Sequence, residues 1–257
     1  HSFPTRRSSD LIIKLKTNEI AISSFNGILD IYNNKKIELI LRKKFFEKNE
    51  GINCMIQLKN GYLALGGKKI KVVGFDVDNK ICDVIYEINI KNGFVNSLQD
   101  LGNNFLVSYD SNHELKLWKN YKFITKYNNN YNIDSIYKIN ENSFITSSLI
   151  ENKINFFGLG GKNNFHELIS FPLSDEINIK KGKNSFIKIN NSYFIFIYEK
   201  IKKQENLEEK FEESKNNEEL NIQEGLCLVE INARKNYLKI FDKKENIDEK
   251  RKYMNLV

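Results

Sequence analysis

Cysteine is scarce in this sequence, and its three copies are spread far apart. Cys54, Cys82 and Cys227 form no C-x-x-C pair. Structural zinc sites commonly need such pairs, and a disulfide framework needs an even set at regular spacing, so the sequence predicts neither. An odd set of separated thiols suits a reducing compartment, and we therefore expect an intracellular protein, cytoplasmic or nuclear.

Long apolar runs and catalytic motifs are also missing. No stretch of about 18 apolar residues occurs, which predicts that no helix spans a membrane, and no secretory signal opens the chain. The sequence has no G-x-S-x-G, H-E-x-x-H or G-x-x-x-x-G-K-[ST] motif. His113, expected in a turn, and His166, expected on a strand, have no second His or Cys at ligand spacing. We therefore expect no enzymatic activity, no metal and no cofactor.

What the sequence does contain is a short pattern that occurs five times. Each copy has an aliphatic residue, a polar turn and a new apolar strand, and the copies begin at Leu15, Leu58, Leu101, Ile139 and Ile189. The intervals between these residues are 43, 43, 38 and 50 residues. A period of about 40–45 residues with several strands per unit is typical of β-propeller blades. The sequence therefore predicts an all-β fold of about five four-stranded antiparallel blades in one domain.

The third repeat shows the expected strands most clearly. Turns are predicted at Asn103-Asn104, because Asn tolerates left-handed backbone angles, and at 110–113. Residues 114–118 alternate polar and apolar, which predicts a half-buried strand. The four strands are expected at 95–101, 105–109, 114–118 and 121–127.

The fifth repeat is interrupted by a charged insertion. Its second strand is expected at 193–198 and its third at 225–231, and residues 199–224 between them are rich in Glu and Lys. Such a composition cannot bury enough apolar surface to fold alone. We expect a solvated extension of the hairpin, with a short helix at 207–211 as one form of it. The alternative is an arm that binds a basic partner.

The end of the third repeat resembles a WD-repeat. Trp118 stands where that family has its closing Trp, Asn112 stands where it has a turn Asp, and Lys119 replaces the Asp that usually follows. The Gly-His pair of well-preserved repeats is absent, so the His–Asp–Ser hydrogen-bond network of the family is not carried over. The matching positions of the first and fourth repeats hold Asn26, Tyr32, Glu151 and Phe157.

The resemblance covers residues 12–245 as degenerate repeats. Propellers of the WD-repeat family usually close with seven blades, so we expect these five repeats to be an incomplete propeller. Residues 1–11, HSFPTRRSSDL, resemble a translated sequencing adapter. We expect them to be an assembly artefact in front of a fragment of a longer protein, and the alternative is a natural disordered terminus. Residues 246–257 are expected to form a charged tail, which could also be truncated.

The resemblance implies a non-catalytic scaffold that binds partner proteins or peptides on one face of the propeller. Loops between blades and the hairpins between second and third strands would build that face. The residues expected there are Phe25, Lys68, Lys69, Tyr109 and His113.

Two alternatives remain open at this point. The formal net charge is +7, and a basic surface can bind RNA or anionic lipid. The lysines are scattered, however, and cluster only at 42–44, 68–69 and 180–181, which is typical of a solvated surface. The other alternative is a propeller module of a larger enzyme or regulator.

Overall fold

All secondary structure in the described part of the chain is β-strand. The computed structural model describes residues 11–47, 50–91, 93–148, 150–160 and 164–172, followed by the strands at 177–179, 186–188, 193–201, 222–232 and 237–242. No helix occurs within these ranges. The predicted all-β class is therefore confirmed for the described residues.

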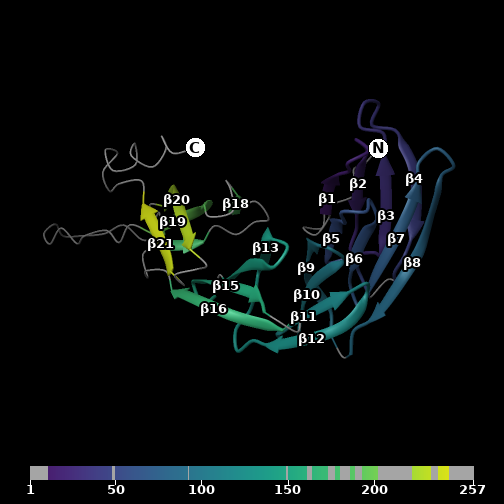
Figure 1. Cartoon of the computed structure of the whole chain (residues 1–257). Coiled ribbons are helices and arrows are strands. Elements are labelled where there is room, and N and C mark those ends of the chain that lie inside the picture. The colour runs from purple at the N-terminus through teal and green to yellow at the C-terminus, as the bar shows by residue number, and fades with distance from the viewer. Residues whose placement is uncertain are drawn as a thin grey trace, which may run out of the picture. The chain divides into compact units, whose positions relative to one another are not determined.

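The strands form four four-stranded antiparallel sheets and one larger sheet (Figure 1). In each of the first four sheets, every strand pairs with the next one along the chain. The first sheet holds β1 (Leu11–Lys14), β2 (Ile20–Ser23), β3 (Ile28–Tyr32) and β4 (Leu39–Lys44), and the second holds β5 (Cys54–Gln57), β6 (Leu63–Gly66), β7 (Lys69–Asp76) and β8 (Ile81–Asn89). The third holds β9 (Val95–Gly102), β10 (Phe105–Asp110), β11 (Glu114–Lys119) and β12 (Lys122–Asn128), and the fourth holds β13 (Ser135–Asn140), β14 (Ser143–Ser148), β15 (Lys153–Leu159) and β16 (Phe165–Pro172).

The third repeat confirms the predicted strands to within one residue at each end. The turn between β9 and β10 lies at Asn103 and Asn104, whose φ angles of 50° and 63° are left-handed, as expected. Tyr121 was predicted to open the fourth strand. It lies instead in the turn before β12, also with a left-handed φ of 63°.

The prediction that β11 is half-buried is wrong. Its four central residues are all buried, and Lys116 is only 8% exposed. The reason is that neighbouring sheets can cover both faces of a strand. An alternating sequence therefore does not guarantee that one face of the strand is exposed to solvent. Lys116 tolerates burial because its ammonium group is bonded to the carboxylates of Asp110 and Glu114.

The fifth sheet differs from the predicted four-stranded blade. It has the order β17 (Ile177–Ile179), β19 (Tyr193–Ile201), β20 (Ile222–Asn232) and β21 (Tyr237–Asp242), and β18 (Phe186–Lys188) also pairs with β19. The central hairpin runs on into the predicted insertion, because Glu199 pairs with Glu224 and Ile201 with Ile222. β-Branched residues such as these two isoleucines favour extended backbone. The remaining insertion, 202–221, and its expected helix lie outside the described residues.

The two ends of the chain were also assigned from the sequence. Leu11, expected to be the last residue of the adapter segment, is the first residue of β1 and pairs with Ser23. Residues 1–10 and the tail from 243 onward lie outside the described residues.

The chain divides into two compact units. The first contains residues 1–144 and 158–166, and therefore the whole of the first three sheets and β13. The second contains residues 145–157 and 167–257. The turns and loops that hold the expected partner-binding residues lie entirely within the first unit.

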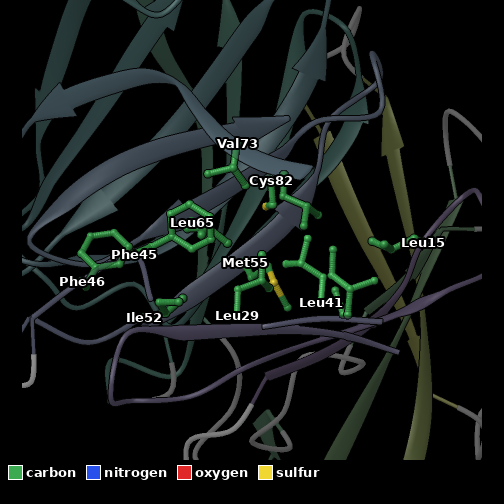
Figure 2. Packing of buried hydrophobic residues seen from close by; sticks show 13 residues of the cluster. Leu15, Leu29, Leu41, Phe45, Phe46, Ile52, Met55, Leu65, Val73 and Cys82 are labelled. Atoms are coloured by element: carbon green, nitrogen blue, oxygen red, sulfur yellow. The ribbon is translucent and has the colours of Figure 1, made fainter. Parts of the chain in front are cut away.

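Within the first unit, apolar layers fill the spaces between successive sheets. One layer joins the first two sheets and includes Leu29, Leu41, Met55 and Leu65 (Figure 2). A second layer joins the second and third sheets and includes Trp118. The first strands also meet in series, because β1 lies against β5, β5 against β9, and β9 against β13. The second sheet therefore has an apolar layer on each face, although its outer strand β8 is largely exposed.

Candidate functional site

The hairpins between second and third strands gather at one end of the first three sheets. A backbone amide from a nearby loop or strand start closes each hairpin turn. Phe45 N donates to Gly27 O at 2.7 Å, Val95 N to Gly67 O at 2.8 Å, and Asn129 N to His113 O at 2.8 Å. We call this surface the hairpin end. It comprises the turns at 24–27, 67–68 and 111–113 with the loops that precede β5, β9 and β13.

Two of the predicted partner-binding residues lie together at the hairpin end. A Cβ added at Gly51 would meet the ring of Phe25 at 3.2 Å, so the ring covers this glycine while remaining 42% exposed. The residue before it, Glu50, holds the Lys68 ammonium group at 3.4 Å from its carboxylate. A Cβ at Gly67 would lie 2.1 Å from Gly51 O, so the two loops can approach this closely only because residue 67 is a glycine.

Lys69 is directed along the second sheet. It is the first residue of β7, and its ammonium group lies 2.6 Å from the carboxylate of Glu87 on β8. The hydrogen bond with Glu87 raises the pKa of Lys69, and the same bond lowers the pKa of Glu87. Lys69 therefore links two strands, whereas its neighbour Lys68 belongs to the turn.

Tyr109 and His113 form a pair of their own in the third sheet. The Tyr109 hydroxyl lies 2.9 Å from His113 Nδ1, and it also donates to Tyr131 O at 3.3 Å. Tyr109 is only 2% exposed, and burial raises its pKa. His113 is exposed in the turn with a φ of 61°. Of this pair, His113 supplies the accessible surface and Tyr109 holds it in place.

Sequence reasoning missed two residues at the hairpin end. Phe94, in the loop before β9, is 41% exposed, and its amide donates to Ser111 Oγ at 3.0 Å. Its neighbour Val95 closes the turn that contains Lys68. The second residue that sequence reasoning missed is Glu50, the ion-pair partner of Lys68. An aromatic residue directly after Gly93, outside any strand pattern, was the one signal that could have indicated Phe94.

The turn between β10 and β11 is organised by Asp110 rather than by Asn112. The buried Asp110 carboxylate accepts hydrogen bonds from the amides of Asn112 at 3.0 Å and Glu114 at 3.2 Å, and it also binds the Lys116 ammonium group. Asn112, which stands at the turn-Asp position of the WD-repeat resemblance, donates its backbone amide to this carboxylate. Behind this turn Trp118 Nε1 donates to Ser108 Oγ at 2.8 Å and ties β11 to β10.

The basic clusters of the sequence carry paired charges where the structure describes them. Arg42 binds Asp30 through two nitrogens at 2.8 Å, Lys43 lies 2.7 Å from Asp83, and Lys44 lies 2.8 Å from Glu47. Surface pairs of this kind contribute little to stability, yet they reduce the free positive charge offered to an anionic partner. Lys180-Lys181 lies outside the described residues.

The described ranges contain no helix with the length and apolar character needed to cross a membrane. Among the same residues, no three His, Cys, Asp or Glu side chains come together in a way that could hold a metal ion. The search against protein-family models gives no match for this chain, and neither does the search of curated proteins.

Proposed function

We propose that the sheets are blades of a WD-repeat-like propeller and that the protein is a non-catalytic scaffold. Three features support the blade arrangement: the repeat period, the serial contacts between first strands, and the apolar layers on both faces of the second sheet. Stacked repeats bury their faces against neighbours in this way. Partner proteins or peptides would bind at the hairpin end.

The exposed aromatic residues of the hairpin end carry this proposal. Phe25 and Phe94 are each about two-fifths exposed although both side chains are large and apolar. The ion pair between Lys68 and Glu50 lies in the same group of turns and loops. Aromatic anchors beside a polar rim are what protein interfaces use for most of their binding energy.

Affinity capture with the full chain tests this proposal through matched variants. Phe25→Ala combined with Phe94→Ala should weaken capture of bound proteins about tenfold or more, because truncating an anchor residue costs about 2 kcal/mol. Phe123→Ala is the control, since Phe123 is 52% exposed but lies on β12, away from the hairpin end.

Two outcomes would contradict the proposal. One is equal capture by the double variant and the wild type. The other is capture that nuclease abolishes and that falls steeply with salt, because RNA bound through phosphate contacts behaves in that way.

A further inference from the structure

The remaining turns of the first three sheets lie at the end opposite the hairpin end. In a four-stranded antiparallel sheet, the first-to-second and third-to-fourth turns share one end, and the second-to-third hairpin lies at the other. Lys16 Nζ of the first sheet donates to Leu58 O at 3.0 Å and to Lys59 O at 3.1 Å in the second. Asn60 Nδ2 of the second sheet donates to the Tyr121 hydroxyl of the third at 3.2 Å. The turns of all three sheets therefore gather at one end.

The third-to-fourth turns at this end form a surface of their own. We call residues 33–39, 77–81 and 119–123, which lead into β4, β8 and β12, the outer-turn end. A pocket of about 340 Å³, lined in part by three asparagines, lies at the same end between the second and third sheets.

Each of these three turns presents a large apolar side chain to solvent. Ile37 is 74% exposed, Ile81 51% and Phe123 52%, and Leu39 beside Ile37 is 45% exposed. Ile37 is the most exposed large apolar residue in the described part of the chain. Single exposed apolar residues are ordinary on protein surfaces, but here one recurs at the same place in three successive sheets.

Lysines accompany the apolar residues in every one of these turns. The three segments contain five lysines and two acidic residues. Lys35, Lys36, Lys80 and Lys122 are exposed, and none of them has an ion-pair partner among the described residues. The fifth, Lys119, holds its ammonium group over an aromatic ring. The adjacent Lys35 and Lys36 thus add an unpaired basic cluster to the paired clusters described above.

The hairpin end does not share this positive charge. Its described residues include two lysines and three acidic residues, namely Lys68, Lys91, Glu47, Glu50 and Asp134. The net charge of the outer-turn end is therefore positive, whereas that of the hairpin end is slightly negative. An asymmetry of this kind orients a protein with its basic end toward an anionic surface.

Exposed aliphatic residues among unpaired lysines fit an anionic membrane surface better than a protein or RNA partner. Protein interfaces are depleted in lysine. RNA is bound by aromatic stacking and by arginine, whereas three of the four exposed apolar residues are aliphatic and the three segments contain no arginine. At a membrane interface, apolar side chains enter the boundary of the acyl chains while ammonium groups meet the anionic headgroups.

We propose that the outer-turn end binds peripherally to an anionic membrane surface. Ile37, Ile81 and Phe123 would enter the interface, and the surrounding lysines would contact the headgroups. This inference goes beyond the scaffold function and does not depend on it. The hairpin end, on the opposite side of the sheets, would stay free for a partner protein.

Co-sedimentation of the full chain with lipid vesicles tests the inference. The protein is first treated with nuclease, and the vesicles contain either phosphatidylcholine alone or phosphatidylcholine and phosphatidylserine in equal parts. The full chain should bind the vesicles with phosphatidylserine about tenfold or more tightly, because each lysine near an anionic surface contributes about fivefold in affinity. This binding should weaken as the salt concentration rises.

Two double variants of equal charge separate local contact from net charge. Lys35→Gln combined with Lys36→Gln should weaken binding to the phosphatidylserine vesicles about tenfold. The matched control is Lys43→Gln combined with Lys44→Gln, which removes the same charge from lysines that are already in ion pairs. The control should weaken binding much less.

A second pair of variants tests the insertion of apolar side chains. Ile37→Asn is combined with Ile81→Thr, because Asn suits the left-handed φ of 56° at residue 37 and Thr keeps a β-branched side chain on β8. Loss of the two apolar side chains should weaken vesicle binding about tenfold. Phe25→Ala combined with Phe94→Ala should bind the vesicles like the wild type.

The inference is overturned if both kinds of vesicle bind equally or if neither sediments the protein. It is also overturned if the Lys35 and Lys36 variant loses no more affinity than its control, or if the Ile37 and Ile81 variant binds like the wild type. Binding of a labelled RNA through the same lysines, without binding to vesicles, would assign the surface to nucleic acid instead. These results would leave the hairpin-end proposal standing, because that proposal depends on Phe25 and Phe94.

Discussion

Bulky residues hold left-handed backbone in the turns that lead into the fourth strands. Ile37, Lys80 and Tyr121 have φ angles of 56°, 54° and 63° and occupy corresponding places in the first three sheets. A non-glycine residue in this region costs about 1–2 kcal/mol. The sequence indicated the turns built from Asn and Gly, but nothing about these three residues predicts a left-handed conformation.

Replacing Ile37 with glycine should stabilise the protein. Ile37 is 74% exposed, so its side chain contributes little packing that could be lost. Relief of strain exceeds the entropy cost of glycine, and we expect a net gain of about 0.5–1 kcal/mol, measured by urea unfolding. Gly27→Ala should instead destabilise the protein. The φ of Gly27 is 78°, and a Cβ there would lie 2.3 Å from Phe46 O. A loss of stability in Ile37→Gly would show that the strain argument is wrong.

Removing the Ser108 hydroxyl should destabilise the third sheet. Ser108 and Trp118 are both buried, so Ser108→Ala leaves the indole N–H without its partner. An unsatisfied buried donor costs about 1–3 kcal/mol. Urea unfolding followed by circular dichroism measures the loss in every variant, including those that lack Trp118, the only tryptophan. Trp118→Phe is the second variant of the cycle, because it removes the indole N–H and keeps an aromatic ring. Trp118→His is unsuitable, because the imidazole would supply another N–H donor. Near-additive losses in the double variant would contradict a coupled pair.

At the scale of secondary-structure elements, each outer strand of the first three sheets contains one extra residue. Ile40, Ile85 and Ile124 fall at the register shifts where β4, β8 and β12 pair with their neighbours. A bulge increases twist and interrupts the row of unpaired backbone groups, which protects an edge strand from pairing with other chains. Short alternating segments gave no sign of these bulges, because register depends on the partner strand.

Deleting Ile85 should leave the second sheet folded. Val84 would still lie opposite Val73, and Tyr86 opposite Val72. We expect a loss of about 1 kcal/mol in thermal unfolding experiments, together with more aggregation by light scattering from the flatter edge. Deleting Asp83 instead shifts Cys82 by one residue and turns it out of the core, so that loss should be larger. Equal losses for the two deletions would argue against the bulge.

The β10–β11 hairpin should make stability depend on pH through Glu114. Burial alone would raise the pKa of Glu114, but hydrogen bonds from Lys116 and Lys126 outweigh it and lower the pKa. A carboxyl group with a lower pKa in the folded state stabilises the fold above its unfolded pKa of about 4.3, and this contribution is lost as the pH falls through the folded pKa.

Unfolding in urea at several pH values measures this contribution. Glu114→Gln should flatten the loss of stability below about pH 4.3 relative to the wild type. The control is Glu47→Gln, whose pKa is lowered by an exposed pair with Lys44, and it should change the acid limb less. An unchanged acid limb in Glu114→Gln would contradict the prediction.

At the scale of the whole molecule, two cysteines lie on opposite faces of the second sheet and can serve as probes of its unfolding. Cys54 lies in the apolar layer shared with the third sheet, and Cys82 in the layer shared with the first. Burial raises the pKa of the Cys82 thiol to about 11, which leaves little reactive thiolate near neutral pH. Labelling at the two positions can therefore show whether the sheets unfold together.

Thiol labelling in the Cys227→Ser variant makes this test specific. Neither cysteine should react with a thiol reagent at about pH 8 without denaturant, because only the thiolate attacks and both groups are buried. In urea, both should become reactive over the same concentration range if stacked sheets unfold as one unit. Reaction of Cys82 alone at lower urea would show that the first two sheets separate early.

The sequence by itself determined the all-β class, the order of the strands and the places of most turns. These features are local, because alternation within a strand and the backbone freedom of Asn and Gly act over a few residues. It also indicated Phe25, Lys68 and His113 as turn residues at one end of the sheets.

Only the tertiary structure decided which of these residues meet. It placed Phe25 near Lys68 through Gly51 and Glu50, turned Lys69 toward Glu87, and buried Tyr109 and Lys116. It also formed the asparagine-lined pocket from loops of two sheets. The physical reason is that burial and contact depend on which sheet covers each face, and that information lies in segments about 40 residues apart.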